Sequence, residues 1–275
     1  MKRVRLGLIF GGRSVEHAVS LVSARAVLDH LDPSRYEVVP IGVTREGRWL
    51  TARDGLMLLD AAGAGQDRIP GATRAVLTAD PSAGGLIPIE PGSSPVPLDM
   101  IFPLVHGTGG EDGTLQGLLE LADLPYVGSG VLGSSLGMDK VAMKVMFRAA
   151  GLRVADCIVV ARRRIEEDLH GIAAEVEARF GYPCFVKPSN GGSSVGVSKV
   201  TGPGGLGPAL AEAAGYDRRV WLVVPNVAPD EGAEAAISEA ASLAAHYVGA
   251  GWAVGVRTLD GSVAPASGPG HLVLV

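Results

Sequence analysis

The chain has 275 residues, a length that allows two domains with ample hydrophobic cores. Its net charge of −5 and its lack of a basic stripe argue against a nucleic-acid partner, and none of its apolar runs approaches the length of a membrane span. Two cysteines in so long a chain do not make a disulfide framework, so we expect a cytoplasmic protein.

The chain begins with the pattern of a parallel α/β layer. Residues 4–10 are an apolar run typical of a buried strand; no signal-peptide pattern precedes them, and a Gly-Gly turn follows. We expect a helix from this turn to about Leu31, with Ser14 as its N-cap and Glu16 in its first turn, where the helix dipole favours an acid. Residues 36–43 form the next predicted strand. This strand–helix–strand order predicts a parallel sheet.

The sequence becomes irregular over residues 52–97, where breaks rich in glycine and proline separate short apolar runs. We expect short strands and loops here that extend the first domain, and we assign them no chemistry. Regularity returns at residues 99–105, an apolar run that predicts another buried strand.

The run His-Gly-Thr-Gly-Gly-Glu-Asp-Gly-Thr-Leu-Gln-Gly, residues 106–117, is the most informative part of the sequence. It leads from the predicted strand to a helix in which Leu115, Leu118 and Leu119 recur at helical spacing. Its glycines would let backbone N–H groups crowd around an anion or a small polar ligand. His106 and the two carboxylates of the run add charge, so the segment predicts a ligand-binding turn.

The second half alternates helices and strands and contains a second glycine-rich segment. We expect a helix from the Met-Asp-Lys sequence to Ala150, a strand at 154–161, a helix at 165–180 and a strand at 184–187. Residues 188–200 are typical of a hairpin with a Gly/Ser tip, in which the strand pattern resumes at Val195. Such a tip is rich in N–H and O–H donors, which suits a flap over a triphosphate.

Four segments of the chain (residues 8–22, 106–117, 128–140 and 185–200) resemble the D-alanine–D-alanine ligases, a family of ATP-grasp enzymes, and occur in the family's order. The resemblance implies an α/β fold with an N-terminal parallel-sheet domain at residues 1–130, followed by the small α+β lobe of an ATP-grasp enzyme at 131–220. It also implies an ATP-dependent ligase that works with Mg²⁺ and joins two D-alanines for peptidoglycan. Family ligases are commonly homodimers.

The resemblance also implies roles for individual residues. Glu16 is expected to bind the ammonium of the first D-alanine in a network with Ser193, and these two residues are the expected catalytic groups. His106 is expected near the carboxylate of that substrate. The groups expected to hold the phosphates of ATP are Lys140, Lys187, Ser193 and Ser194. Taken singly, Glu16 could be an ordinary first-turn acid, Lys140 a helix-start cation and Ser193 a turn former.

The sequence departs from the family pattern near residue 220. Where the family has a glutamate that contacts the nucleotide, this chain has Val223, and the Arg-x-Asp and Asn-Glu-x-Asn segments that supply metal ligands are not visible. We therefore expect the large C-terminal lobe to be missing or replaced over residues 221–275 by a helix and a strand, with no metal ligands. Two hypotheses remain open: a ligase with impaired activity, and a truncated or fused remnant that at most binds D-alanine or nucleotide. The second substrate of a ligase could equally be D-lactate or D-serine.

Overall fold

The structure is a computed structural model that describes residues 2–52, 58–60, 71–83, 85–216, 220–225, 257–258 and 261–262. The chain divides into two compact units, an N-terminal unit at Met1–Ser135 and a C-terminal unit at Leu136–Val275. The helix predicted between residues 231 and 247, and most of the strand predicted after it, lie outside the described residues.

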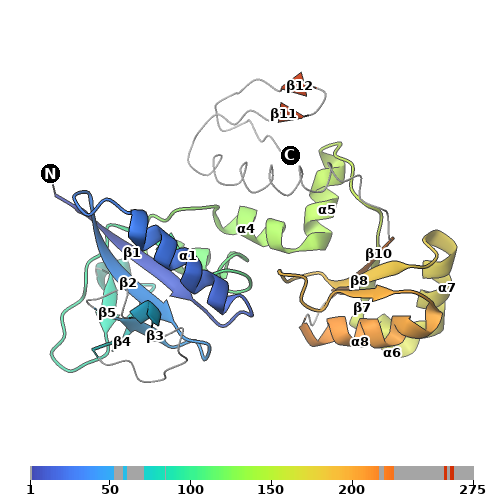
Figure 1. The fold of residues 1–275 in the computed structure, drawn as a ribbon, viewed down its shortest axis with the longest axis horizontal. Helices are drawn as coiled ribbons and strands as arrows, with labels where there is room; N and C mark the ends of the chain where they lie inside the picture. Colours follow the sequence, from blue (N-terminus) through green and yellow to red (C-terminus); the bar gives the residue numbers. More distant parts are fainter. Residues whose placement is uncertain are drawn as a thin grey trace. The chain divides into compact units, whose positions relative to one another are not determined.

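A mixed sheet forms the centre of the N-terminal unit (Figure 1). In chain order its described strands are β1 (Val4–Gly11), β2 (Tyr36–Val43), β3 (Trp49–Thr51), β4 (Thr73–Leu77), β5 (Leu86–Pro88) and β6 (Met100–Pro103). Their order across the sheet is β5-β4-β3-β2-β1-β6. The strands β2, β1 and β6 are parallel, as predicted, and β3, β4 and β5 extend the sheet with antiparallel pairs. The described part of the irregular segment thus contains short strands, as predicted, and these strands pair antiparallel.

Side chains of β1 enter a core on each face of this sheet. Leu8 and Phe10 belong to the cluster that includes Ala24 of α1 (His17–His30), whereas Ile9 belongs to the cluster that includes Leu119 of α3 (Thr114–Leu121). A parallel strand covered on both faces reads as a continuous apolar run, which is why residues 4–10 predicted a buried strand. A short 3₁₀ turn, η1 (Pro81–Ala83), lies between β4 and β5.

The C-terminal unit has an antiparallel sheet in the order β7-β10-β8-β9. Its strands are β7 (Ile158–Ala161), β8 (Cys184–Pro188), β9 (Ser198–Val200) and β10 (Val220–Pro225), and its described helices are α5 (Lys140–Ala149), α6 (Arg162–Glu167), α7 (Leu169–Arg179), the 3₁₀ turn η2 (Pro203–Gly205) and α8 (Leu206–Tyr216). A separate two-stranded antiparallel pair is formed by β11 (Arg257–Thr258) and β12 (Gly261–Ser262). α4 (Val131–Met138) crosses the boundary between the units and was not predicted.

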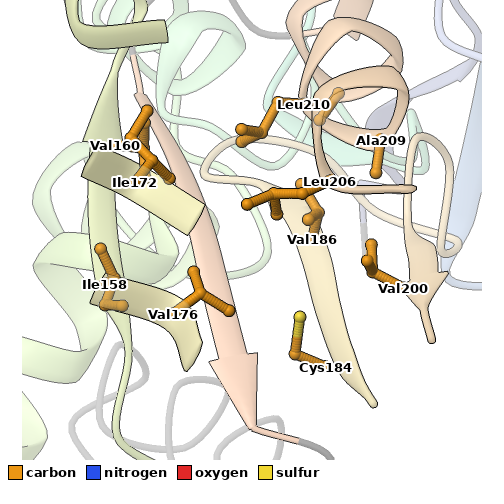
Figure 2. Close-up of a cluster of buried hydrophobic side chains, with 11 residues drawn as sticks. Ile158, Val160, Ile172, Val176, Cys184, Val186, Val200, Leu206, Ala209 and Leu210 are labelled. Carbon is orange, nitrogen blue, oxygen red and sulfur yellow. The ribbon is translucent and has the colours of Figure 1, made fainter. Parts of the chain in front are cut away.

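One hydrophobic core joins the helices to the sheet in this unit (Figure 2). Ile172 and Val176 of α7 and Leu206 and Leu210 of α8 pack against inward side chains of the strands, including Val186 of β8. The single helix predicted at 165–180 is wrong, because the chain forms α6 and α7 with a break at Asp168, whose carboxylate accepts from the N–H of Gly171. Aspartate favours such local hydrogen bonds over continuing a helix.

Candidate functional site

The loops after β1 and β6 lie at one edge of the N-terminal sheet. β1 pairs in parallel with β2, the next strand in the chain, and on its other side with β6, which comes much later. The chain order therefore changes direction between β1 and β6, and open α/β sheets bind ligands outside the carboxyl ends of the strands at such a point. Glu16 follows β1 and His106 follows β6. The two residues predicted to bind the first substrate thus belong to neighbouring loops of one unit.

Ser14 connects these two loops and is not the helix N-cap predicted from the sequence. Its buried hydroxyl donates to the carbonyl oxygen of His106 at 2.7 Å and accepts from the backbone N–H of Glu16 at 3.2 Å. α1 begins at His17, so Glu16 occupies the N-cap position, and its side chain makes no capping hydrogen bond. The prediction was wrong because the helix begins at His17, so Ser14 lies two residues before the N-cap and its hydroxyl also bonds across to the other loop.

The Glu16 carboxylate lies against Gly107. A Cβ added at position 107 would overlap Glu16 Oε2 and would lie 3.2 Å from Ser14 Cβ. Gly107 also has a φ of +70°, which L side chains rarely adopt. Glycine is therefore required here both by the backbone conformation and by the space that the carboxylate fills.

The His106 ring lies between a hydroxyl and a carboxylate. Its Nε2 is 2.9 Å from Ser23 Oγ, and that hydroxyl donates to the carbonyl oxygen of Val19 at 3.1 Å. Because the hydroxyl has one proton to give, Nε2 is the nitrogen that donates in this pair. The other nitrogen, Nδ1, faces Glu111 Oε1 at 3.6 Å. The ring is thus held between Ser23 on one side and Glu111 on the other.

The turn at residues 107–113 is shaped by its own polar side chains. Glu111 Oε2 accepts from the N–H of Gly107 at 2.8 Å, and Gln116 Nε2 donates to the carbonyl oxygen of Gly110 at 2.8 Å. Asp112 accepts from the N–H groups of Gly109 and Thr114 at 2.8 and 3.0 Å. Partial burial raises the pKa of Asp112, but these hydrogen bonds outweigh it, so the pKa lies below its ordinary value of 3.8. The acids of this run thus partly serve to fold the turn.

Lys187 is on the face of β8 that points away from the helices. Cys184 and Val186 point into the core beneath α7 and α8, and side chains alternate along a strand, so Phe185 and Lys187 share the opposite face. The Lys187 ammonium lies 5.9 Å from the centroid of the Phe185 ring. Lys187 is half-buried on this face.

The segment between β8 and β9 is the glycine-rich hairpin connection predicted from the sequence. Ser193 and Ser194 are exposed and have φ values of +49° and +56°, so their conformation is left-handed. Successive residues in such conformations point backbone N–H groups to one side, which makes an anion-binding concavity. The strand was predicted to resume at Val195, but β9 begins at Ser198. The difference arises because the N–H groups of Val195 and Val197 donate to carbonyls within the turn.

Lys140 attaches the start of α5 to this connection. Asp139 caps the helix by accepting from the N–H groups of Val141 and Ala142 at 2.9 and 3.1 Å. The backbone N–H of Lys140 donates to the carbonyl oxygen of Ser189 at 2.9 Å, and its ammonium donates to that of Gly191 at 2.7 Å. The lysine predicted to hold phosphate thus lies at the base of the loop that contains Ser193 and Ser194.

Among the described residues there is no group of three or more His, Cys, Asp or Glu side chains placed to hold a metal ion by themselves. The network of Glu16 with Ser193 remains a prediction, because the two residues belong to different units.

Sequence reasoning found the residues of the two motifs but missed Ser23 and the linking role of Ser14. Ser23 is 83 residues from His106 in the chain, and a serine inside a helix gives no local signal of a long-range partner. Glu111 was part of the recognised turn, and its pairing with His106 was not predicted.

The described residues contain no helix with the length and apolarity needed to span a membrane.

Comparison with known proteins identifies relatives over most of the chain. The family model described as "D-ala D-ala ligase N-terminus" matches residues 5–129, and that described as "D-ala D-ala ligase C-terminus" matches residues 146–249. The second match continues beyond residue 220, where the sequence pattern of the family was judged to end. A D-alanine–D-alanine ligase from Thermoanaerobacter pseudethanolicus is 44% identical over 223 residues, which are 81% of this chain and 60% of that protein.

Solved structures of the same kind share the fold. The VanG D-Ala:D-Ser ligase from Enterococcus faecalis superposes with a TM-score of 0.71 at 33% identity, covering 81% of this chain and 63% of that one. The D-alanine-D-alanine ligase from Coxiella burnetii gives a TM-score of 0.72 at 31% identity, covering 82% of this chain and 62% of that one. The chain therefore spans about 60% of the length of the curated relatives it matches.

Proposed function

Because the chain belongs to the D-alanine–D-alanine ligase family, we propose that it acts as an ATP-dependent ligase that joins two D-alanines. The observation that carries the proposal is the position of Glu16 and His106 in neighbouring loops at the carboxyl ends of β1 and β6. A carboxylate and an imidazole in that arrangement suit the ammonium and the carboxylate of one small amino acid. The parts of the relatives that this chain does not span are outside the proposal.

The proposed reaction has two steps. A carboxylate oxygen of the first D-alanine attacks the γ-phosphorus of ATP, ADP leaves, and an acylphosphate forms. The amine of the second D-alanine then attacks the acyl carbon, and phosphate leaves from a tetrahedral intermediate as the peptide bond forms. The protein contributes chiefly by positioning the reactants and balancing their charge. Glu16 would hold the ammonium of the first D-alanine, and His106 would lie near its carboxylate.

The phosphate side of the proposal involves the C-terminal unit. Lys187 would pair with phosphate oxygens from the face of β8 opposite the helices, and the N–H and hydroxyl groups of Ser193 and Ser194 would cover them. Lys140 would add a second ammonium at the base of the same loop. Magnesium would accompany ATP and would offset the charge of its phosphates, and no step is assigned to the ion.

The test is phosphate release from Mg-ATP by the 275-residue chain, measured with and without D-alanine, together with mass spectrometry of the product. We expect phosphate release that depends on D-alanine and yields D-alanyl-D-alanine, with L-alanine giving none. Glu16→Gln should remove the dependence on D-alanine. Offering D-serine or D-lactate with D-alanine identifies the second substrate. Release that is the same with and without D-alanine would contradict the proposal.

A second candidate function is non-catalytic binding of D-alanine or nucleotide, and the observation that favours it is Val223, which stands where the family has a glutamate that contacts the nucleotide. Calorimetric titration separates the two candidates. Binding of D-alanine without any turnover would support the binding protein, whereas turnover would exclude it. A chain that neither binds nor turns over D-alanine would contradict both.

A further inference from the structure

Two buried serines each join the segment from β1 to α1 with the loop after β6. The Ser14 bridge runs from the N–H of Glu16 to the carbonyl of His106. The Ser20 hydroxyl accepts from the N–H of Gly11 at 2.7 Å and donates to the carbonyl of Leu104. Both hydroxyls are saturated by backbone groups of the two loops. Only Ser14 is hydrogen-bonded directly to Glu16 and His106, the two residues of the candidate site.

The hydrogen bonds of Ser14 fix the distance between Glu16 and His106, which the local conformation of either loop does not determine. Glu16 and His106 are far apart in sequence, and each belongs to a loop whose conformation depends on its own turn. The Ser14 hydroxyl bonds to the backbone of both residues at once, and Ser14 also packs beside Gly107, against which the Glu16 carboxylate lies. A shift of the Ser14 side chain therefore moves the backbone from which the side chains of Glu16 and His106 extend.

We propose that Ser14 is a positioning residue that sets the spacing between the Glu16 carboxylate and the His106 ring, and thereby selects a small α-amino acid. The proposal rests on the proposed function, since it assigns the two ends of one D-alanine to these groups. Ser14 itself touches no substrate atom in this scheme. Removing its hydroxyl leaves the His106 carbonyl and the Glu16 N–H without their shared partner, so the two loops lose their common reference.

Ser20 offers a matched control within the same chain. Ser14→Ala and Ser20→Ala each delete a buried hydroxyl that links the same two loops through two backbone groups. Both variants are expected to lose stability, because each leaves a backbone donor and acceptor unsatisfied. Only Ser14→Ala should alter the geometry of Glu16 relative to His106.

The experiment combines two readouts on the full chain. The first is the affinity for D-alanine by calorimetry, for which we expect a loss of about tenfold or more in Ser14→Ala, as a small misplacement of binding groups produces. The second is the ¹⁵N chemical shifts of the His106 ring without ligand, which report its contacts with Ser23 and Glu111. We expect these shifts to change in Ser14→Ala and to stay at wild-type values in Ser20→Ala. Ser14→Thr, which keeps the hydroxyl, should restore both readouts, and Ser14→Val, which has the same shape without it, should not.

Each outcome decides the proposal. Unchanged His106 shifts in Ser14→Ala, or equal changes in Ser14→Ala and Ser20→Ala, would overturn it. If wild-type protein does not bind D-alanine, the proposed function fails, but the His106 spectra still decide whether Ser14 positions the ring. If Ser14→Ala does not fold, amide hydrogen exchange at Glu16 in the wild-type chain takes its place, and exchange as fast as in an unprotected peptide would overturn the proposal.

Discussion

The two units hold their candidate ligand groups in opposite ways. In the N-terminal unit, Glu16 and His106 directly follow strands of the sheet and are joined through one buried hydroxyl. In the C-terminal unit, Ser193 and Ser194 are exposed residues of a connection between two strands, and Lys140 bonds to the base of that connection. The proposed amino-acid site is thus built into the sheet edge, and the proposed phosphate site is built on a loop.

This difference suits the two ligands. A small zwitterion can be recognised only if two charged groups stay at a fixed separation, which favours rigid attachment to strand ends. A triphosphate must enter, be covered and leave as a diphosphate, which favours a loop that can open and close.

Deleting a core side chain in either unit should have the largest effect on stability. Ile41 of β2 and Ile172 of α7 are both fully buried, and truncation of such residues to alanine costs about 2–5 kcal/mol. Because their cores are separate, Ile41→Ala should lower the urea midpoint of the N-terminal unit, and Ile172→Ala that of the C-terminal unit. Methyl NMR signals from each unit during urea unfolding provide the measurement. Equal shifts of both units in both variants would show that the cores unfold together.

Gly107→Ala should abolish the amino-acid site, whereas Gly109→Ala should not. Both glycines have a positive φ, but an added Cβ meets Glu16 and Ser14 at position 107 and meets nothing within 4 Å at position 109. The backbone strain of about 1 kcal/mol is shared by the two variants. The displacement of the Glu16 carboxylate occurs only in Gly107→Ala, which should weaken D-alanine binding by about a hundredfold. Calorimetry compares them, and similar affinities in the two variants would contradict this account of Glu16.

Removing the Lys140 ammonium should destabilise the loop that contains Ser193 and Ser194, without affecting the affinity for D-alanine. Lys140→Met loses the hydrogen bond to Gly191, so the amides of residues 191–196 should exchange about tenfold faster, as expected for the loss of one buried bond. Nucleotide affinity should fall with it, and D-alanine affinity should not. Lys199→Met is the control, because Lys199 is exposed on β9. Unchanged amide hydrogen exchange in Lys140→Met would show that the lysine does not stabilise the loop.

Acid should unfold the 107–113 turn only at low pH, and this is the smallest of the predicted effects. The pKa of Asp112 is lowered in the folded protein, so its stabilising contribution is complete above the ordinary value of 3.8 and is lost as pH falls through the lowered pKa. The amide signals of Gly109 and Thr114 should therefore stay constant from neutral pH to about pH 4 and move below it. Asp112→Asn should remove that movement, and a transition near neutral pH would contradict the assignment.

The helices and strands that bury apolar residues were predictable from the sequence. Most of the hydrogen bonds between these elements were not. The strands at 4–10 and 36–43 and the helix after the 106–117 turn were predictable, because burial on one or both faces leaves a periodic pattern. The pattern does not show where a helix breaks, so Asp168 was missed. It also placed Ser14 at a helix cap, since a serine before a helix has that local role far more often than a role across the sheet.

The candidate residues were recognised through motifs, but their arrangement came only from the fold. Glu16 and His106 were expected to bind the same substrate, and the parallel pairing of β1 with β6 is what makes their loops neighbours. The contacts of His106 with Ser23 and Glu111 depend on the orientation of one ring, which no spacing in the sequence encodes.

The position of β10 has a consequence for the order of events during synthesis on the ribosome. β10 lies between β7 and β8 in the sheet, although it follows β9 in the chain. The strands β7 and β8 therefore have no ladder to each other, and they become parts of one sheet only after residues 220–225 have left the exit tunnel. The N-terminal unit completes its parallel strands with β6, much earlier in translation. A nascent chain paused before residue 220 should therefore have completed the strands that precede Glu16 and His106, while the sheet of its second unit still lacks β10.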